Sequence, residues 1–312
     1  MPVTFATFNV RNLFLADDPR GEGRGAVGSA KRRAFVAERL DHLATQLARI
    51  DADVVLLQEV TGEASVEALA ERVEARARYA TRFAAPTDER GIGNAILSRL
   101  PVRWVRSHGS AALPVPVFVE GQAPPFGAAL PLRRPFVHAL VEARELGAVH
   151  VFGAHLKSQM PRALRRADGS EVSPSSAAEH AEALFRALLM RSAEALFLRR
   201  CVDDALVGAA EAERKAIVLG DLNDTVDSFP VRLLRARGPE ALHPAIELLT
   251  SGRRRTVIHG GEGLVIDHAL LTWPLFRLVR SVVIHDDGLK ELGRSESTVI
   301  ASDHAPVVVE VG

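Results

Sequence analysis

Apolar residues in the first third of the chain follow two different spacings. Short apolar runs predict β-strands over residues 4–10, 54–58 and 95–97. Between the first two runs, apolar residues recur at steps of four and three, which predicts an amphipathic helix over 30–50: Val36, Leu40, Leu43, Leu47 and Ile50. A second helix is marked by Val66, Leu69, Val73 and Ala77. Strands that alternate with helices predict layers of helix on sheet.

The rest of the chain continues this alternation. Residues 136–143 and 149–155 are strand-like runs around a turn at 145–147, as in a β-hairpin. Ser176 and Glu179 form a capping box, which predicts a long helix that ends near Leu206. Further strands are predicted over 216–219, 264–271, 278–284 and 307–311, and the proline-rich stretch 114–135 predicts an irregular loop. Because neither a repeat nor a shift in composition divides the chain, we expect one domain over residues 1–312.

Composition narrows the class of protein. The 39 basic and 39 acidic residues cancel, which excludes the strongly basic surface of a non-specific nucleic-acid binder. Neither a secretory signal nor an apolar run long enough to cross a bilayer is visible, so we expect a cytoplasmic protein without a membrane partner. The single cysteine, Cys201, is expected to be a small apolar residue inside a helix. The sequence indicates no oligomeric state.

Polar residues recur where the predicted apolar strands end. Six such places hold Asn9, Gln58 with Glu59, His155, Asp221 with Asn223, Asp267 with His268, and Asp303 with His304. A sheet fixes its strand ends rigidly and the adjoining loops leave them accessible, so catalytic groups are well positioned there. One polar residue at such a place is commonly a cap or a turn residue. Six of them indicate a site, in which we assign function to Asp267 and a structural role to His268.

The residue types agree with metal-assisted attack of water on a phosphoryl centre. Glu59 and Asp303 are hard oxygen ligands and Asn9 adds an amide, a set that suits Mg²⁺ or Mn²⁺. The two histidines, His155 and His304, could bind a phosphate oxygen or transfer protons. Asp267 could fix the tautomer of one histidine. Asp221 could orient or deprotonate the attacking water, and Asn223 could hold a phosphate oxygen.

Seven motifs, taken in order, resemble those of the endonuclease/exonuclease/phosphatase superfamily. They are FNVRNLF at 8–14, LQEV at 57–60, GIGNAILSR at 91–99, GAHLKS at 153–158, GDLND at 220–224, IDH at 266–268 and SDHAPV at 302–307. Each motif alone is weak, but their order spans nearly the whole chain. The resemblance implies an α/β fold of DNase I-like type, a four-layer α/β sandwich in which two packed mixed β-sheets are flanked by helices.

The resemblance also implies a role for each matching residue. Glu59 corresponds to the principal metal-binding carboxylate, with Asn9 and Asp303 completing the metal site. Two positions after Asn9 many relatives carry an acidic or amide residue. This chain has Arg11, which we expect either to bind phosphate as a substrate residue or to point into the loop, and the number of metal ions stays open.

The remaining matches fall on catalytic and substrate-binding positions. Asp221 corresponds to the aspartate that activates or positions the water, and Asn223 to the asparagine that contacts phosphate. His304, paired with Asp267, corresponds to the histidine on the scissile phosphate, and His155 to a second histidine that stabilises transition-state charge or assists the leaving group. Asn94 and Lys157 are expected on the substrate side.

We therefore expect an enzyme, a Mg²⁺- or Mn²⁺-dependent phosphodiesterase. The preferred substrate is DNA, cut by in-line attack of water to leave a 3′ hydroxyl and a 5′ phosphate, with RNA as a second nucleic-acid partner. A phosphatase or a small-molecule or lipid phosphodiesterase of the same superfamily, acting on a small phosphoester, is the alternative, because substrate choice resides in loops. A non-catalytic binding module is the third reading, and the full set of acid, base and metal residues argues against it.

Overall fold

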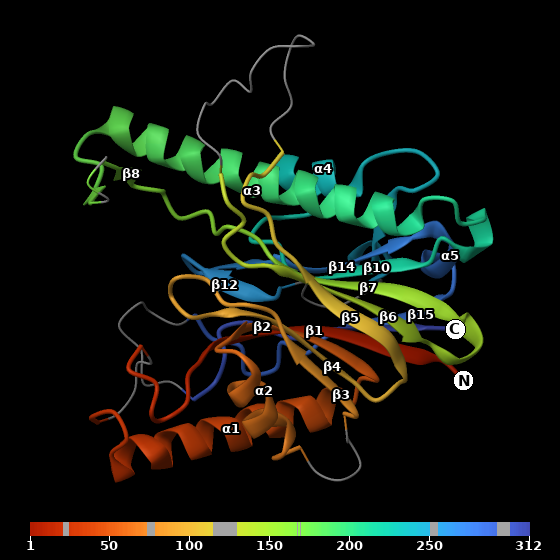
Figure 1. The fold of residues 1–312 in the computed structure, drawn as a ribbon, viewed down its shortest axis with the longest axis horizontal. Helices are drawn as coiled ribbons and strands as arrows, with labels where there is room; N and C mark the ends of the chain where they lie inside the picture. Colours follow the sequence, from red (N-terminus) through yellow and green to blue (C-terminus); the bar gives the residue numbers. More distant parts are fainter. Residues whose placement is uncertain are drawn as a thin grey trace.

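Two six-stranded β-sheets lie face to face in the computed structural model, and helices cover the two outer faces (Figure 1). The structure describes the chain except for residues 21–24, 74–78, 115–129, 167, 169, 250–254 and 292–299. Helices α1 and α2 lie below one sheet, and α3 and α4 lie above the other (Figure 1). The predicted four-layer α/β sandwich is confirmed.

The first sheet is mixed. Its strand order is β15-β16-β1-β2-β4-β3, in which β1 and β2 are parallel and all other neighbours are antiparallel. The strands are β1 (Val3–Leu13), β2 (Val54–Val60), β3 (Thr81–Ala84), β4 (Gly93–Ser98), β15 (Val279–Ile284) and β16 (Val307–Val311).

The second sheet is also mixed, with the order β11-β14-β10-β7-β6-β5 and one parallel pair, β7 with β10. Its strands are β5 (Val102–His108), β6 (Phe136–Glu142), β7 (Ala148–His155), β10 (Ala216–Asp221), β11 (Leu242–Pro244) and β14 (Asp267–Thr272). Two small hairpins stand outside the sheets, formed by β8 (Leu164–Arg165) with β9 (Glu171–Val172) and by β12 (Val257–His259) with β13 (Glu262–Leu264).

Both long helices begin at a serine cap, of which the sequence predicted the one at Ser176. Helix α1 covers Ala30–Ile50, with the Ser29 hydroxyl accepting from the Arg32 amide. Helix α3 covers Ala177–Leu206, and both hydrogen bonds of the predicted capping box at Ser176 are present. The shorter helices are α2 (Glu63–Ala70), α4 (Phe229–Arg235) and α5 (Trp273–Phe276), with 3₁₀ turns η2 (Arg144–Leu146), η3 (Glu211–Glu213) and η4 (Ala245–Leu248).

Three expectations need correction. The second helix ends at Ala70, short of Val73, and Ala77 lies outside the described residues. The run 264–271 is not one strand, because the chain leaves the β12–β13 hairpin at Leu264 and enters the large sheet only at Asp267. Strand β1 continues to Leu13 instead of giving way to a loop at residue 11. Most of the predicted loop 114–135 lies outside the described residues.

The core between the sheets is apolar and closely packed. Phe5, Leu56 and Ile96 of the first sheet share one buried cluster with Val151 and Leu219 of the second. Separate clusters join α1 and α2 to the first sheet, and α3 and α4 to the second. Cys201 lies in the α3 cluster, where burial raises the pKa of its thiol to about 11, in agreement with the expected inert role.

A glycine allows the two parallel strands of the second sheet to approach closely at their ends. A Cβ atom on Gly220 would lie 1.9 Å from the carbonyl oxygen of Ala154. Because that obstacle is main chain, no side-chain rotation relieves it. The residues that follow, Asp221 on β10 and His155 on β7, are paired in the ladder, so Gly220 sets their separation.

We predict that Gly220→Ala lowers the free energy of unfolding by about 3 kcal/mol, because one strand must move away from the other. The measurement is urea denaturation followed by circular dichroism. Gly109→Ala is the matched control, since its Cβ would meet nothing within 4 Å, and its effect should stay within about 0.5 kcal/mol. Equal stability of the two variants would contradict the packing argument.

Three histidines form a hydrogen-bonded row across β5, β6 and β7. His108 Nε2 lies 2.9 Å from His138 Nδ1, and His138 Nε2 lies 3.0 Å from His150 Nδ1. His138 is fully buried and stacks on Phe152, with ring centroids 3.8 Å apart. Burial, reinforced by the neighbouring imidazoles, lowers the pKa of His138 to about 2. The folded protein therefore holds this ring neutral.

We predict that His138 makes the folded protein less stable in mild acid. Below its usual pKa of about 6.5 the unfolded chain binds a proton there that the folded chain does not, so stability falls as pH falls. The free energy of unfolding should drop by about 1.4 kcal/mol per pH unit below 6.5 relative to His138→Gln, which lacks this proton. Chemical denaturation of both proteins between pH 5 and 7.5 measures the difference, and parallel curves would refute the assignment.

Candidate active site

The sheet topology brings the ends of several strands to one edge of the seam between the sheets. In each sheet the parallel pair ends there, and the antiparallel neighbours β4, β14 and β16 begin there. Asp221 is paired in register with His155 on one side and with Asp267 on the other. The strand-end residues predicted from the sequence therefore share one region of the fold.

Bulges at the ends of β1 and β2 direct side chains toward this edge. The register of β1 against β2 shifts between Asn9 and Leu13, and that of β2 against β4 shifts between Gln58 and Val60. Arg11 and Glu59 lie in these interruptions with φ angles of 53° and 64°. Bulges and left-handed residues commonly re-aim side chains beside functional sites.

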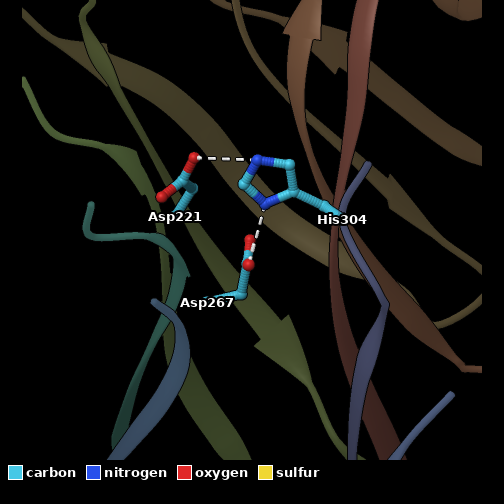
Figure 2. Close-up of side chains that lie close together, drawn as sticks. All are labelled: Asp221, Asp267 and His304. Carbon is cyan, nitrogen blue, oxygen red and sulfur yellow. Dashed lines mark hydrogen bonds and ion pairs between the residues drawn. The ribbon is translucent and has the colours of Figure 1, made fainter. Parts of the chain in front are cut away.

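A row of three side chains forms the centre of the site (Figure 2). His304 Nδ1 donates to Asp267 Oδ2 at 2.9 Å, and His304 Nε2 lies 3.8 Å from Asp221 Oδ2. Burial disfavours a charged imidazole, but the carboxylates of Asp267 and Asp221 outweigh it and raise the pKa of His304. The imidazolium can therefore present its Nε2 proton to an oxygen in the site, as the predicted pairing with Asp267 requires.

Asp221 is the most heavily contacted carboxylate of the row. Asn9 Nδ2 donates to its Oδ2 at 3.0 Å from the facing sheet, and the Asn223 amide donates to its Oδ1 at 2.9 Å. His155 Nε2 lies 3.5 Å from the same Oδ2 atom. Burial, followed by repulsion from Asp267, raises the pKa of Asp221.

His155 differs from His304 in its charge. It is 4% exposed, and burial together with the nearby Arg134 guanidinium lowers its pKa well below the usual value. The site therefore holds one neutral and one charged imidazole on either side of Asp221. Within the described chain, His155 Nδ1 and Asp267 Oδ1 are buried atoms without a hydrogen-bond partner, and such atoms commonly mark a place for a ligand.

Oxygen ligands predicted for the metal lie on the first-sheet side of this row. Asn9 Oδ1 accepts from the Arg11 amide and Glu59 Oε2 accepts from the Asn12 amide, each at 2.9 Å. Asp303 Oδ2 lies 3.7 Å from Arg11 Nε, so the Arg11 guanidinium lies beside one of the predicted metal ligands. A second group could also hold a cation, since one ligand atom from each of Asp221, Asp267 and His304 lies within 4.8 Å of the others.

Two of the three predicted substrate residues, Asn94 and Lys157, make their hydrogen bonds to the protein itself. The Lys157 ammonium donates to the Ser158 carbonyl and hydroxyl and to the Met160 carbonyl, all within 3.0 Å, so it closes its own turn. Asn94 is buried and donates to the Pro135 carbonyl at 2.9 Å. His268 is also buried, with Nε2 2.8 Å from the Asp224 carbonyl oxygen.

Sequence reasoning missed three buried charged residues that hold the loop after β7. Arg134 donates to the carbonyls of His155 and Leu156, and Glu194 accepts from the Lys157 amide at 2.6 Å. Arg191 donates to Asp224 Oδ2 at 2.9 Å and to the Lys157 and Ser158 carbonyls at 3.3 Å, which joins the loops after β7 and β10. A signal existed for two of them, because residues 191 and 194 interrupt the apolar stripe of α3 with charge.

Several solved structures of known proteins resemble this fold. Among solved structures, truncated TDP2 from Caenorhabditis elegans is 15% identical with a TM-score of 0.59, covering 100% of this chain and 97% of the other. Mannosyl-6-phosphatase Bt3783 of Bacteroides thetaiotaomicron is 17% identical (TM-score 0.60), and a 3′-5′ exonuclease of Neisseria meningitidis is 17% identical (TM-score 0.56), each covering 99% of both chains. At sequence identities this low, the structural similarity establishes a common fold and nothing more.

In the described part of the chain, none of the helices is long and apolar enough to span a membrane. No curated protein sequence matches the chain.

The family is established by a match to the amino-acid sequence. A family model for the Endonuclease/Exonuclease/phosphatase family matches residues 6–304, nearly the full length, in agreement with the seven motifs and the sandwich fold. The chain therefore belongs to the endonuclease/exonuclease/phosphatase family.

Proposed function

We propose that the protein hydrolyses phosphodiester bonds with the help of a bound Mg²⁺ or Mn²⁺ ion, and that its substrate is DNA. The observation that carries the proposal is the row Asp221–His304–Asp267, in which both carboxylates are buried, with His155 on the other side of Asp221. It combines a carboxylate of raised pKa, an oriented imidazolium and a neutral imidazole within one site. These groups match the needs of water attack at phosphorus.

Asp221 is proposed to orient the attacking water and accept its proton. A raised pKa makes this carboxylate a better base than an exposed aspartate. The side chain of Asn9 and the amide of Asn223 fix its two oxygens, so it meets the water in one orientation. His304, held by Asp267, donates its Nε2 proton to a phosphoryl oxygen as negative charge develops.

The remaining residues of the site are assigned by position. His155 is proposed to assist the leaving group, and Asn223 to contact the phosphate. Arg11 is proposed as a second phosphate contact because its guanidinium lies beside Asp303, a predicted metal ligand. Asn94 is proposed to shape the substrate side of the site by holding the Pro135 carbonyl. Lys157 is proposed to do so by closing the turn after β7.

The oxygen-rich side of the site fits a hard divalent cation. Asn9, Glu59 and Asp303 supply amide and carboxylate oxygens, the donors that Mg²⁺ and Mn²⁺ prefer. These three residues would hold the ion. When bound, it would offset negative charge on the phosphoryl oxygens.

DNA is preferred because one neighbouring structure holds DNA. The Neisseria protein was solved as a 3′ phosphatase bound to a product DNA hairpin. The mannosyl-6-phosphatase of Bacteroides has the same fold, so a phosphatase acting on a small phosphomonoester is the second candidate. The two candidates differ in whether the cleaved phosphate carries one ester bond or two.

We predict that Asp267→Asn lowers kcat by about 10²- to 10⁴-fold, because the amide no longer stabilises the imidazolium or fixes its tautomer. The measurement is steady-state hydrolysis of the preferred substrate. Asp227→Asn is the matched control, since Asp227 is an exposed carboxylate in the loop after β10, and its kcat should be unchanged. Full activity of Asp267→Asn would contradict the catalytic role assigned to His304.

Metal and substrate are tested together. Plasmid, linear single- and double-stranded DNA, RNA, bis-p-nitrophenyl phosphate and p-nitrophenyl phosphate are incubated with wild type and His304→Ala, with Mg²⁺, Mn²⁺ or EDTA. We expect the wild type to cut DNA with either ion, and we expect no cutting in EDTA or by the variant. Glu59→Ala should need at least tenfold more metal for half-maximal rate. Turnover of the monoester alone would favour the phosphatase, and cutting in EDTA would reject metal dependence.

A further inference from the structure

The side chain of His155 is not held in the site by a strong hydrogen bond of its own. Among the described residues, its ring atom Nδ1 has no hydrogen-bond partner. Its Nε2 atom lies 3.5 Å from Asp221 Oδ2, which is longer than an ordinary hydrogen bond between nitrogen and oxygen. The position of the ring therefore depends on the main chain at the end of β7 and on the packing around it.

A proline removes one of the hydrogen bonds that would fix this end of β7. In the ladder between β6 and β7, Val137 lies opposite Gly153. The same register, continued by two residues, sets Pro135 opposite His155. Because proline has no N–H group, it cannot donate to a carbonyl of the neighbouring strand.

The guanidinium of Arg134 takes the place of the missing donor. The His155 carbonyl shares a peptide group with the Leu156 amide, which donates to the Asp221 carbonyl of β10 at 3.0 Å. The two ends of a trans peptide group point in opposite directions, so the His155 carbonyl points to the side of β6. There Arg134 Nε donates to it at 3.1 Å, and Arg134 Nη2 donates to the Leu156 carbonyl at 2.8 Å. One planar group thus fixes the two carbonyls that follow the His155 side chain.

The guanidinium is itself anchored on a loop of the first sheet. Arg134 Nη1 lies 3.7 Å from Asp88 Oδ2, and the two side chains are 8% and 1% exposed. Asp88 belongs to the loop between β3 and β4, where its Oδ1 accepts from the amides of Arg90 and Ile92 at 2.9 and 3.3 Å. The Arg90 side chain donates to Asp88 Oδ2 at 3.3 Å. A carboxylate fixed by one sheet therefore helps to place the group that fixes a strand end of the other.

We propose that Arg134 is a positioning residue for His155, and that Asp88 fixes Arg134 in this role. The inference rests on the proposed function, in which His155 assists the leaving group. By replacing the ladder hydrogen bond that Pro135 cannot make, the guanidinium keeps the imidazole within reach of the departing oxygen. Arg134 acts through the main chain, so this role requires no contact with the substrate.

The test compares two leaving groups on the same phosphoryl group, in the p-nitrophenyl and phenyl esters of thymidine 5′-phosphate, with Mn²⁺ present. Phenolate leaves less readily than p-nitrophenolate, so the phenyl ester depends more on assistance at the departing oxygen. Arg134→Met should lower kcat about 10²-fold on the phenyl ester and less than about tenfold on the p-nitrophenyl ester. Asp88→Asn should change the ratio of the two rates in the same direction by a smaller factor.

Two further variants calibrate this ratio. His155→Ala is the reference and should show the same selective loss on the phenyl ester. Arg133→Met is the matched control, because this neighbouring arginine pairs with Glu89, and its ratio should equal that of the wild type. Circular dichroism verifies that each variant folds. If Arg134→Met does not fold, Asp88→Asn carries the test, since the amide side chain keeps an oxygen for the two main-chain amides of its loop.

A second readout does not depend on activity. In protein labelled with ¹⁵N-histidine, the imidazole resonances of His155, assigned by their loss in His155→Ala, should shift in Arg134→Met. Those of His42, on helix α1, should not shift. Unchanged His155 resonances in the folded variant would overturn the inference.

The outcomes separate the inference from the proposed function. A selective loss in His155→Ala without one in folded Arg134→Met would overturn the inference alone. Equal losses on both esters in His155→Ala would contradict the leaving-group role of His155 and, with it, the positioning role as stated. If the wild type hydrolyses neither diester, the proposed activity fails, and the same comparison is made with p-nitrophenyl phosphate and phenyl phosphate. A shift of the His155 resonances would still support the positioning role.

Discussion

The site depends on one buried carboxylate at the seam between two sheets. Asp221 is 1% exposed, so its charge must be matched by groups that the fold brings to it. Asn9 comes from the first sheet, Asn223 from the adjoining loop, and the two histidines from either side. The contacts from Asn9 and His304 cross from the first sheet to the second, so they depend on the apolar core that holds the two sheets face to face. The packing of the two sheets therefore determines the geometry of the site around Asp221.

Much of the fold was predictable because local signals agreed with the tertiary structure. The helix over 30–50 has both its apolar stripe and its serine cap, and the long helix after Ser176 has a capping box and ends where expected. Strand β5 was missed because arginines interrupt its apolar run at the sheet edge. Strand β3 was missed because its four residues are only half-buried. Such edge strands form through pairing with neighbours, which a local pattern does not record.

The candidate site was predictable in outline for a topological reason. Polar residues at apolar strand ends converge when parallel strands share an edge, and the hydrogen bond between His304 and Asp267 follows the predicted pairing. Its supports were predictable only in part. Arg191 and Glu194 place charge in the apolar stripe of α3, which is a signal, but Arg134 has none. The main-chain groups that all three residues hold leave no mark in the sequence. The left-handed conformation of Glu59 likewise arises from a bulge, and glutamate has no preference for it.

Arg191 has a consequence for the dynamics of the site. One guanidinium binds the loop after β7 and the loop after β10, and it projects from the buried side of α3. If either loop opens, the other loses a partner, and a buried cation is left partly unpaired. The two loops therefore form one cooperative opening unit, whose free energy is set by the attachment of α3 to the sheet. Amide hydrogen exchange in both loops would then report how firmly α3 is docked on the sheet.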